Sequence, residues 1–378
     1  MNDIANKDLL PAGLQDLLPP DAAREADIGA RLLASFHSHG YERVKPPFIE
    51  FEDSLLSGTG ADLAASSFRL MDPISHHMMA LRSDMTPQVA RIARTRLARS
   101  PRPLRLSYGG DILRVEGSEL RPERQFAQVG FELIGAASPQ ADAEIILLAV
   151  EALSALGVQN LTVDLNAPTL VTAIIDQLEL DAKNHTALRA ALDLKDGSGV
   201  AALGGAAVAQ LNDLLGATGA AGPALEALTK LDLPKEAQAA ATSLCDVARL
   251  VLEASPGLAM TIDPVERRGF EYQTGVSFTL FASGVRGELG RGGRYPLGTG
   301  ETATGVTLFL NPLLQAAKRL DRTPSVYIPL EAAQSGTRLR ADGWRTVTGL
   351  EIDSDANAEA KRLRCSHILR NKKPEAIV

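Results

Sequence analysis

The chain has 378 residues, 22% of them charged and 45% hydrophobic, which excludes intrinsic disorder and is enough for about two or three folded domains. Its 39 Lys and Arg against 46 Asp and Glu give a net charge of −7, a balance that disfavours general binding to nucleic-acid phosphates. Its two cysteines, Cys245 and Cys365, lack metal-ligand spacing and argue against a disulfide scaffold, a zinc ribbon or an iron–sulfur site.

The first third of the chain is predicted to alternate helices and strands. Apolar residues recur at helical spacing behind Pro19-Pro20, whereas the segment after Gly40 alternates apolar and polar residues as a half-buried strand does. A turn-like Asp72-Pro73 between two apolar runs predicts a hairpin. The predicted helices are 21–39 and 86–99, and the predicted strands or extended segments are 41–45, 48–50, 67–70 and 78–81.

The middle of the chain adds a second group of strands and a helical stretch. Strands that follow one another with short connections predict a mainly antiparallel sheet flanked by helices, an α+β fold, rather than repeated βαβ units. Residues 168–258 are rich in Ala and Leu with glycine breaks, which predicts several short helices. The predicted strands are 104–106, 111–116, 126–134 and 161–165, with strand patterning again over 260–281, and the predicted helices are 141–156 and 312–320.

Pro324 opens a small tail in which a strand–helix–strand–helix pattern predicts a compact α/β domain. Its nine Lys and Arg against seven Asp and Glu are too balanced for a nucleic-acid surface by charge alone. The predicted elements of this tail are 325–330, 332–342, 344–350 and 356–366. We therefore predict a core of residues 1–166 and 259–322, a helical insertion over 167–258 and a C-terminal domain over 324–378.

A carboxylate and a hydroxyl stand where a predicted strand meets a predicted helix, at Asp84 and Thr86. Such a pair is suited to holding an ammonium group. Asp and Thr are also the residues that helix starts prefer, so a plain helix cap is the alternative interpretation. The segment alone does not separate the two.

Polar residues also gather on the predicted strands 111–116 and 126–134. If these strands pair as a hairpin, their two-residue period puts Gln128 and Glu132 on one face, and Arg114 shares a face of the partner strand with Glu116. Four polar groups lining one face could bind a small ligand. A solvated face of salt-bridged residues is the alternative.

Two later segments carry weaker signals. Arg268, Glu271 and Tyr272 lie between two apolar runs, an arrangement suited to a small zwitterion or the edge of an imidazole. The glycine-rich stretch 287–295 lacks the Gly-Lys-Ser/Thr of a phosphate loop, so we interpret it as a turn near a ligand. The few histidines lack further ligands at metal spacing, and we expect no metal site.

Six segments in one order resemble the class II aminoacyl-tRNA synthetase core, specifically that of histidyl-tRNA synthetase, over almost the whole chain. They are GLQDLLP at 13–19 with PFIE at 47–50, LRSDMT at 81–86, the stretch from Arg114 through Arg124 and Gln128 to Glu132, DAE at 142–144, RGFEY at 268–272 and GGRY at 292–295. The resemblance implies a histidine pocket in which Asp84 and Thr86 hold the α-amino group. It also implies that Arg114 and Arg268 face the carboxylate, and it gives the remaining contacts to Gln128, Glu132, Glu271, Tyr272 and Tyr295.

The third motif of that family is altered here. It should end in glycine, a hydrophobic residue, an acid and an ATP-binding arginine, whereas Phe309 stands near the glycine and Pro312 near the arginine. Loss of the guanidinium removes stacking and charge on ATP, and a phenylalanine fills space that a base needs. Gln273 stands where the synthetase has a second tyrosine, and the tail resembles only a shortened anticodon-binding domain.

A partly kept amino-acid pocket, a broken ATP site and a shortened tRNA domain together resemble the regulatory-subunit family of ATP phosphoribosyltransferase. The resemblance implies a non-catalytic subunit that a short-form catalytic chain requires in the first step of histidine biosynthesis. It implies that the subunit takes part in feedback inhibition by histidine. It further implies a homodimer through the first motif within a larger hetero-oligomer, and no tRNA partner.

Two other functions stay open from the sequence. A divergent histidyl-tRNA synthetase would still form histidyl-adenylate, and Pro312 is the residue that argues against it. A stand-alone amino-acid-binding module would associate with no phosphoribosyltransferase. We expect no cofactor. Residues 1–13 lack a secretory pattern and Glu144 and Glu151 break the most apolar run, so we expect a cytoplasmic protein without a membrane span.

Overall fold

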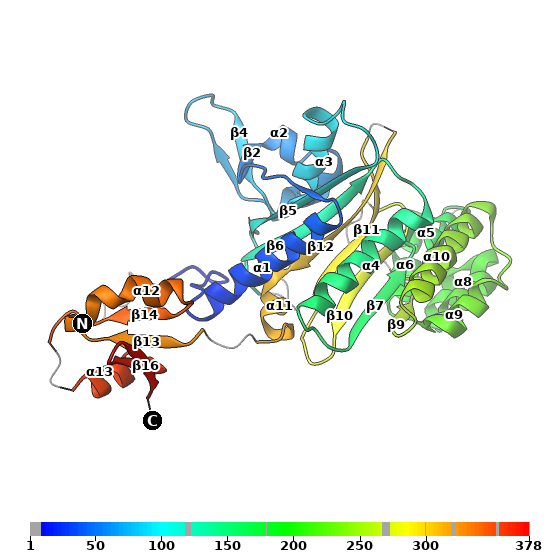
Figure 1. The fold of residues 1–378 in the computed structure, drawn as a ribbon. Helices are drawn as coiled ribbons and strands as arrows, with labels where there is room; N and C mark the ends of the chain where they lie inside the picture. The colour runs from blue at the N-terminus through cyan, green and yellow to red at the C-terminus, as the bar shows by residue number, and fades with distance from the viewer. Residues whose placement is uncertain are drawn as a thin grey trace. The chain divides into compact units, whose positions relative to one another are not determined.

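A nine-stranded sheet forms the centre of the larger part of the chain (Figure 1). The computed structural model describes residues 9–117, 122–178, 180–266, 273–298, 300–319, 323–352 and 355–377. The chain divides into two compact units, Met1–Lys318 and Arg319–Val378. Within the described residues, no helix is both long enough and apolar enough to cross a membrane.

The central sheet is antiparallel over its middle and contains parallel pairs toward both edges. Its order among the described residues is β1-β5-β6-β12-β11-β10-β7-β9-β8. Neighbours from β5 to β7 run antiparallel, whereas β1 pairs with β5 and β7 with β9 in parallel. The strands are β1 Glu42–Arg43, β5 Leu104–Leu113, β6 Gln125–Ile134, β7 Leu161–Asn166, β8 Gly219–Ala220, β9 Ala259–Ile262, β10 Ser277–Ala282, β11 Gly290–Pro296 and β12 Thr302–Phe309. The predicted α+β fold with a mainly antiparallel sheet is confirmed.

Helices cover one face of this sheet (Figure 1). These are α1 Asp21–Ser38, α4 Pro139–Ala155 and α11 Leu310–Ala316. Because side chains alternate along a strand, β6 turns Val129, Phe131 and Leu133 into the apolar core shared with these helices. The Phe36 ring of α1 lies 4.4 Å from the Phe131 ring, centroid to centroid. Apolar packing thus holds these helices against the sheet.

The opposite face of the sheet contacts α3 Thr86–Thr95, which packs on β5 and β6 through a second apolar cluster. We call it the polar face, because Gln128 and Glu132 are buried on it next to that cluster. Ahead of α3 lies a separate antiparallel sheet in the order β2-β4-β3. Its strands are β2 Ile49–Phe51, β3 Arg69–Met71 and β4 Met78–Leu81, and α2 Glu52–Leu55 and a 3₁₀ segment Gly58–Ser66 join β2 to β3. The predicted hairpin is present, because β3 pairs directly with β4.

Between β7 and β9 the chain forms the run of helices that its Ala- and Leu-rich composition predicts. They are α5 Pro168–Ile175, α6 Ala182–Asp193, α7 Gly197–Leu203, α8 Val208–Gly216, α9 Ala221–Leu228 and α10 Lys235–Ala254. Helix α10 packs on both α4 and α5, and its apolar residues join the same core as the central sheet. A separate helical subdomain stays a prediction.

The C-terminal unit has its own four-stranded sheet in the order β14-β13-β15-β16. Its elements are β13 Ser325–Ile328, a 3₁₀ segment Leu330–Ser335, α12 Gly336–Ala341, β14 Arg345–Thr348, α13 Ala356–Arg362, β15 His367–Arg370 and β16 Lys373–Ala376. The predicted strand–helix–strand–helix order is found, and the last residues add a pair of antiparallel strands.

Three predicted elements were wrong in detail. Segments 104–106 and 111–116 are not separate strands, because Gly109-Gly110 continue the β5 ladder opposite β6. The stretch 287–295 is not a turn throughout, since Gly290–Pro296 pairs with β12 along its whole length. The helix that begins at Thr86 ends at Thr95 rather than at residue 99, and residues 96–99 continue as turns.

Candidate functional site

The polar face of the central sheet carries a cluster of side chains from neighbouring strands. The two-residue alternation of β6 places Gln128 and Glu132 on this face with Gly130 between them, as predicted. The strand register sets Gly130 opposite Tyr108 of β5 and opposite Thr307 of β12. The hydroxyls of Tyr108 and Thr307 therefore lie beside Glu132 and form a hydrogen bond with each other at 2.8 Å.

Glu132 is the centre of this cluster, and its residue is only 1% exposed. One carboxylate oxygen accepts hydrogen bonds from the hydroxyls of Thr86 at 3.1 Å and Tyr108 at 3.3 Å, and the other accepts one from Tyr295 at 2.9 Å. Burial raises the pKa of Glu132 to about 8, although the Tyr295 and Thr86 hydrogen bonds act to lower it. A Glu132 that is mostly protonated near neutral pH can donate a hydrogen bond as well as accept one.

Asp84 and Gln128 form a second polar pair at the start of α3. The Gln128 amide donates to one oxygen of Asp84 at 3.1 Å and accepts from the backbone N–H of Met85 at 3.2 Å. The other oxygen of Asp84 accepts from the backbone N–H of Thr86 at 2.8 Å. Asp84 thus bonds the first helical residue, although the N-cap position itself is Met85, which makes no side-chain cap bond. That role is compatible with holding a ligand, because the carboxylate sits beside Thr86 and Gln128.

A pocket lies over Gly293 and Gly305, which face each other across β11 and β12. It is narrow, with about 10 Å³ of space for the centres of water-sized molecules, and it opens to solvent. A Cβ on Gly305 would collide with the Glu132 carboxylate, and one on Gly293 would lie 2.9 Å from the Gln273 amide. These glycines therefore make room for polar side chains. The side chains that line the pocket include Thr86, Glu132, Gln273, Arg291, Tyr295 and Thr307.

The far side of the same strands is held by a buried ion pair. Asp142 of α4, 1% exposed, binds Arg294 of β11 at 2.7 Å and Thr304 of β12 at 2.6 Å. Arg294 and Thr304 are paired across the two strands, so one carboxylate ties both strands to α4. Because Tyr295 follows Arg294 directly, this ion pair fixes the strand position from which Tyr295 reaches Glu132.

Arg114 lies just beyond β5, next to the ring of Phe126. Its guanidinium carbon is 5.3 Å from the centroid of the Phe126 ring, and its Nε donates to the carbonyl of Ser83 at 3.3 Å. Burial lowers the pKa of Arg114, while the charge of Asp84 acts to raise it. The Phe309 ring meets Phe126 edge to face at 5.8 Å and is buried, so it occupies volume that a glycine would leave open. Pro312 stands in the first turn of α11 and supplies no cation.

The structure brings together most of the predicted site residues. Arg114 lies beside the cluster that they form, which contains Asp84, Thr86, Gln128, Glu132 and Tyr295. Arg268, Glu271 and Tyr272 lie outside the described residues. Within the described part of the chain, no three His, Cys, Asp or Glu side chains approach closely enough to hold a metal ion. Sequence reasoning missed Tyr108 and Thr307, which strand alternation would find only once the register between strands is known.

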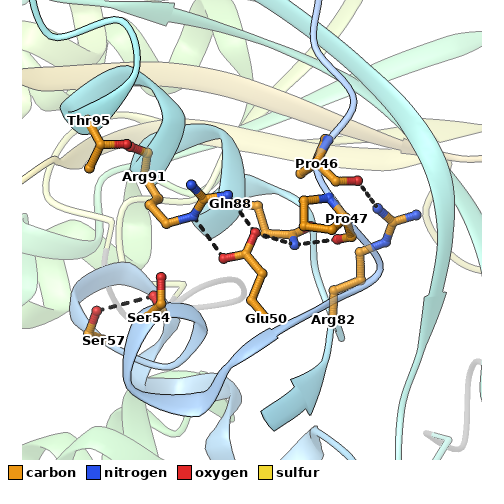
Figure 2. Close-up of polar contacts among 9 residues, drawn as sticks. All are labelled: Pro46, Pro47, Glu50, Ser54, Ser57, Arg82, Gln88, Arg91 and Thr95. Carbon is orange, nitrogen blue, oxygen red and sulfur yellow. Dashed lines mark hydrogen bonds and ion pairs between the residues drawn. The ribbon is translucent and has the colours of Figure 1, made fainter. Parts of the chain in front are cut away.

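A network around Glu50 connects α3 to the small sheet (Figure 2). The Glu50 side chain is 8% exposed and accepts two hydrogen bonds from Arg91, at 2.8 and 2.5 Å. The Gln88 amide donates to Glu50 at 2.8 Å and to the carbonyl of Pro47 at 2.7 Å. Because Thr86 of the pocket begins the same helix, the network joins the pocket to strand β2.

Replacing Glu50 by alanine is expected to lower the free energy of unfolding by about 3 kcal/mol, because Arg91 and Gln88 would lose their buried acceptor. Urea unfolding followed by circular dichroism measures this. The matched control is Glu52→Ala, which removes the partly exposed ion pair with Arg69 and should cost about 1 kcal/mol or less. Equal losses in both variants would contradict the assigned role of Glu50.

Comparison with known proteins identifies the family to which this fold belongs. A family model for histidyl-tRNA synthetase matches residues 13–313. A crystal structure titled as an ATP phosphoribosyltransferase regulatory subunit/histidyl-tRNA synthetase from Bacillus halodurans C has a TM-score of 0.81 at 23% identity, covering 94% of this chain and 96% of that one. Histidyl-tRNA synthetase from Nostoc sp. PCC 7120 has a TM-score of 0.79 at 18% identity, covering 96% and 91%. The fold is thus that of a class II synthetase core of the histidyl type.

Closer relatives carry one name. The "ATP phosphoribosyltransferase regulatory subunit" of Rhodospirillum centenum is 54% identical, covering 95% of this chain and 94% of that protein. The proteins of the same name from Paramagnetospirillum magneticum and Pseudomonas aeruginosa PAO1 are 51% and 35% identical, covering 100% and 93% of this chain and 99% and 92% of those proteins. The chain belongs to the ATP phosphoribosyltransferase regulatory subunit family. The resemblance noted from the sequence motifs is confirmed.

Proposed function

We propose that this chain is a non-catalytic subunit that activates a short-form ATP phosphoribosyltransferase in the first step of histidine biosynthesis and makes it sensitive to histidine. The main support is the site itself. Buried polar groups suited to an amino acid, centred on Glu132 and Asp84, remain, while Phe309 packs on Phe126, the ring that Arg114 contacts. The site keeps groups that can pair with an amino acid, whereas Phe309 and Pro312 stand near the positions where a synthetase has a glycine and an ATP-binding arginine.

The ligand contacts follow from the chemistry of these side chains. Asp84 and Thr86 would hold the α-ammonium group of histidine, since a carboxylate and a hydroxyl accept its hydrogen bonds. Arg114 would face the carboxylate, together with Arg268. Glu132 and Tyr295, 2.9 Å apart, would take the imidazole, with Gln128, Glu271 and Tyr272 completing the pocket. No tRNA and no cofactor enter this proposal.

Regulation of a different chain requires two states of the assembly. Histidine bound here can change the rate of a catalytic subunit only if it binds those states with unequal affinity. The Glu50 network offers a physical connection, because α3 carries Thr86 in the pocket and also holds β2 through Arg91.

The same strand supports the proposed homodimer through the first motif. Phe48, Ile49 and Phe51 are 38%, 36% and 49% exposed, so large apolar side chains of this segment meet solvent in the single chain. Apolar side chains gathered in this way favour burial against another protein surface. We infer that a second copy covers them, within a larger hetero-oligomer that contains the catalytic subunits, in the cytoplasm.

The deciding experiment measures the phosphoribosyltransferase rate of a short-form catalytic chain from the same organism, with and without this protein and then with histidine. We expect the protein to raise the rate and histidine to suppress it. An unchanged rate would contradict the proposal. Histidine-dependent ATP–pyrophosphate exchange by the purified chain would instead indicate a divergent histidyl-tRNA synthetase, and binding of histidine without any effect on the catalytic chain would indicate a stand-alone binding module.

A further inference from the structure

Gln273 is a mostly buried side chain at the edge of the pocket. The residue is 6% exposed and lines the pocket, and its amide makes no hydrogen bond to the described residues. The amide is not among the fully enclosed unpaired groups of the described chain, so it faces the solvent of the pocket. A polar group that is paired with water in a pocket can exchange that water for a ligand group with matching hydrogen bonds.

The strand register places this amide next to Glu132. Gly293 and Gly305 are directly paired, so the positions of their absent side chains lie on the same face of the sheet. A Cβ on Gly305 would meet the Glu132 carboxylate, and one on Gly293 would meet the Gln273 amide. The two polar groups therefore lie side by side over adjacent glycines. The backbone after Gln273 is anchored to β11, since the Thr274 N–H donates to the Arg294 carbonyl at 2.9 Å.

We propose that Gln273 is a specificity-determining residue that, together with Glu132, recognises a flat, neutral side chain with one ring N–H donor and one ring nitrogen acceptor. This rests on the proposed function, in which the ligand is histidine. A neutral imidazole has that pair of groups. Glu132 can accept from the ring N–H while the Gln273 NH₂ group donates to the other nitrogen. The Gln273 amide makes this contact without a titratable group.

Calorimetric titration of the full chain with two ligands tests this. The ligands are L-histidine and β-(2-thienyl)-L-alanine, which keeps a five-membered aromatic ring but has no ring nitrogen. In Gln273→Leu, the Kd for histidine should rise about tenfold or more, as expected for loss of one buried hydrogen bond. The Kd for thienylalanine should stay the same or fall, so the preference for histidine should shrink by at least about tenfold. Gln159→Leu, at an exposed glutamine, is the matched control and should change neither Kd.

The alternatives give different results. Equal weakening of both ligands in Gln273→Leu, or no change for either, would overturn the assignment of Gln273 while leaving histidine binding intact. Failure of the unaltered chain to bind histidine, alone and with the catalytic chain, would instead overturn the proposed function and this inference with it. Thermal unfolding checks that the variant folds, and Gln273→Met, which keeps the unbranched shape without the amide, replaces it if it does not.

Discussion

Substituting Gly305→Ala should abolish histidine binding and lower the free energy of unfolding by about 2–3 kcal/mol. The added Cβ would collide with the carboxylate of Glu132, which is 1% exposed and held by three hydroxyls. Overpacking of a buried site typically costs about 1–3 kcal/mol, and here the displaced group also loses its hydrogen bonds. Calorimetric titration measures the binding, and urea unfolding measures the stability.

Gly216→Ala is the matched control for this substitution. Gly216 is the exposed last residue of helix α8, and a Cβ there would meet nothing within 4 Å. Because alanine is the better helix former, this variant should be as stable as the original chain or more stable by up to about 1 kcal/mol. Histidine affinity close to that of the original chain in Gly305→Ala would show that the ligand does not use the pocket over Glu132.

The second large effect concerns pH. Burial raises the pKa of Glu132 from its ordinary 4.5 to about 8, so the folded protein holds this proton more tightly than the unfolded chain does. Its contribution to the free energy of unfolding is therefore fully present below about pH 4.5 and is lost as pH rises toward 8. The slope in that window is at most about 1.4 kcal/mol per pH unit.

Glu132→Gln isolates this contribution, because glutamine keeps the shape and cannot ionise. Urea unfolding between pH 5 and pH 9 should show the stability of the original chain falling, relative to the variant, up to about pH 8 and then running parallel. The control Glu226→Gln, at an exposed glutamate of α9, should follow the original chain throughout. Parallel curves for the original chain and Glu132→Gln over the whole range would mean that Glu132 is ionised in the folded protein.

Elements with strong local signals could be predicted from the sequence nearly to the residue. The helix predicted over 21–39 is α1 Asp21–Ser38, and the strand predicted over 126–134 is β6 Gln125–Ile134. In α1 the apolar spacing and the stop at Gly40 agree with each other. In β6 the alternation places one set of side chains in the core and the other on the polar face.

Glycine-containing strands were harder to predict, because their glycines are needed to avoid collisions with side chains that are distant in the sequence. Gly110 of β5 gives room to the guanidinium of Arg82, and Gly305 of β12 to Glu132. Arg82 and Glu132 are not sequence neighbours of these glycines, so the local sequence pattern predicts turns there instead of strands. The pocket shows the same limit. The motifs identified Glu132, whereas Tyr108 and Thr307 became apparent only through the pairing of β5, β6 and β12.

The order of strands in the central sheet has a consequence for how the chain folds. Tyr108 and Thr307 touch within the pocket although they are 199 positions apart, and the helices α5 to α10 lie in the interval between them. Contacts of such long sequence separation slow folding, because a large loop must close before they form. The hairpin of β5 and β6 can form early from local contacts. The pocket is completed only when β12 docks on β6, so a nascent chain acquires its ligand site only after β12 has been synthesised.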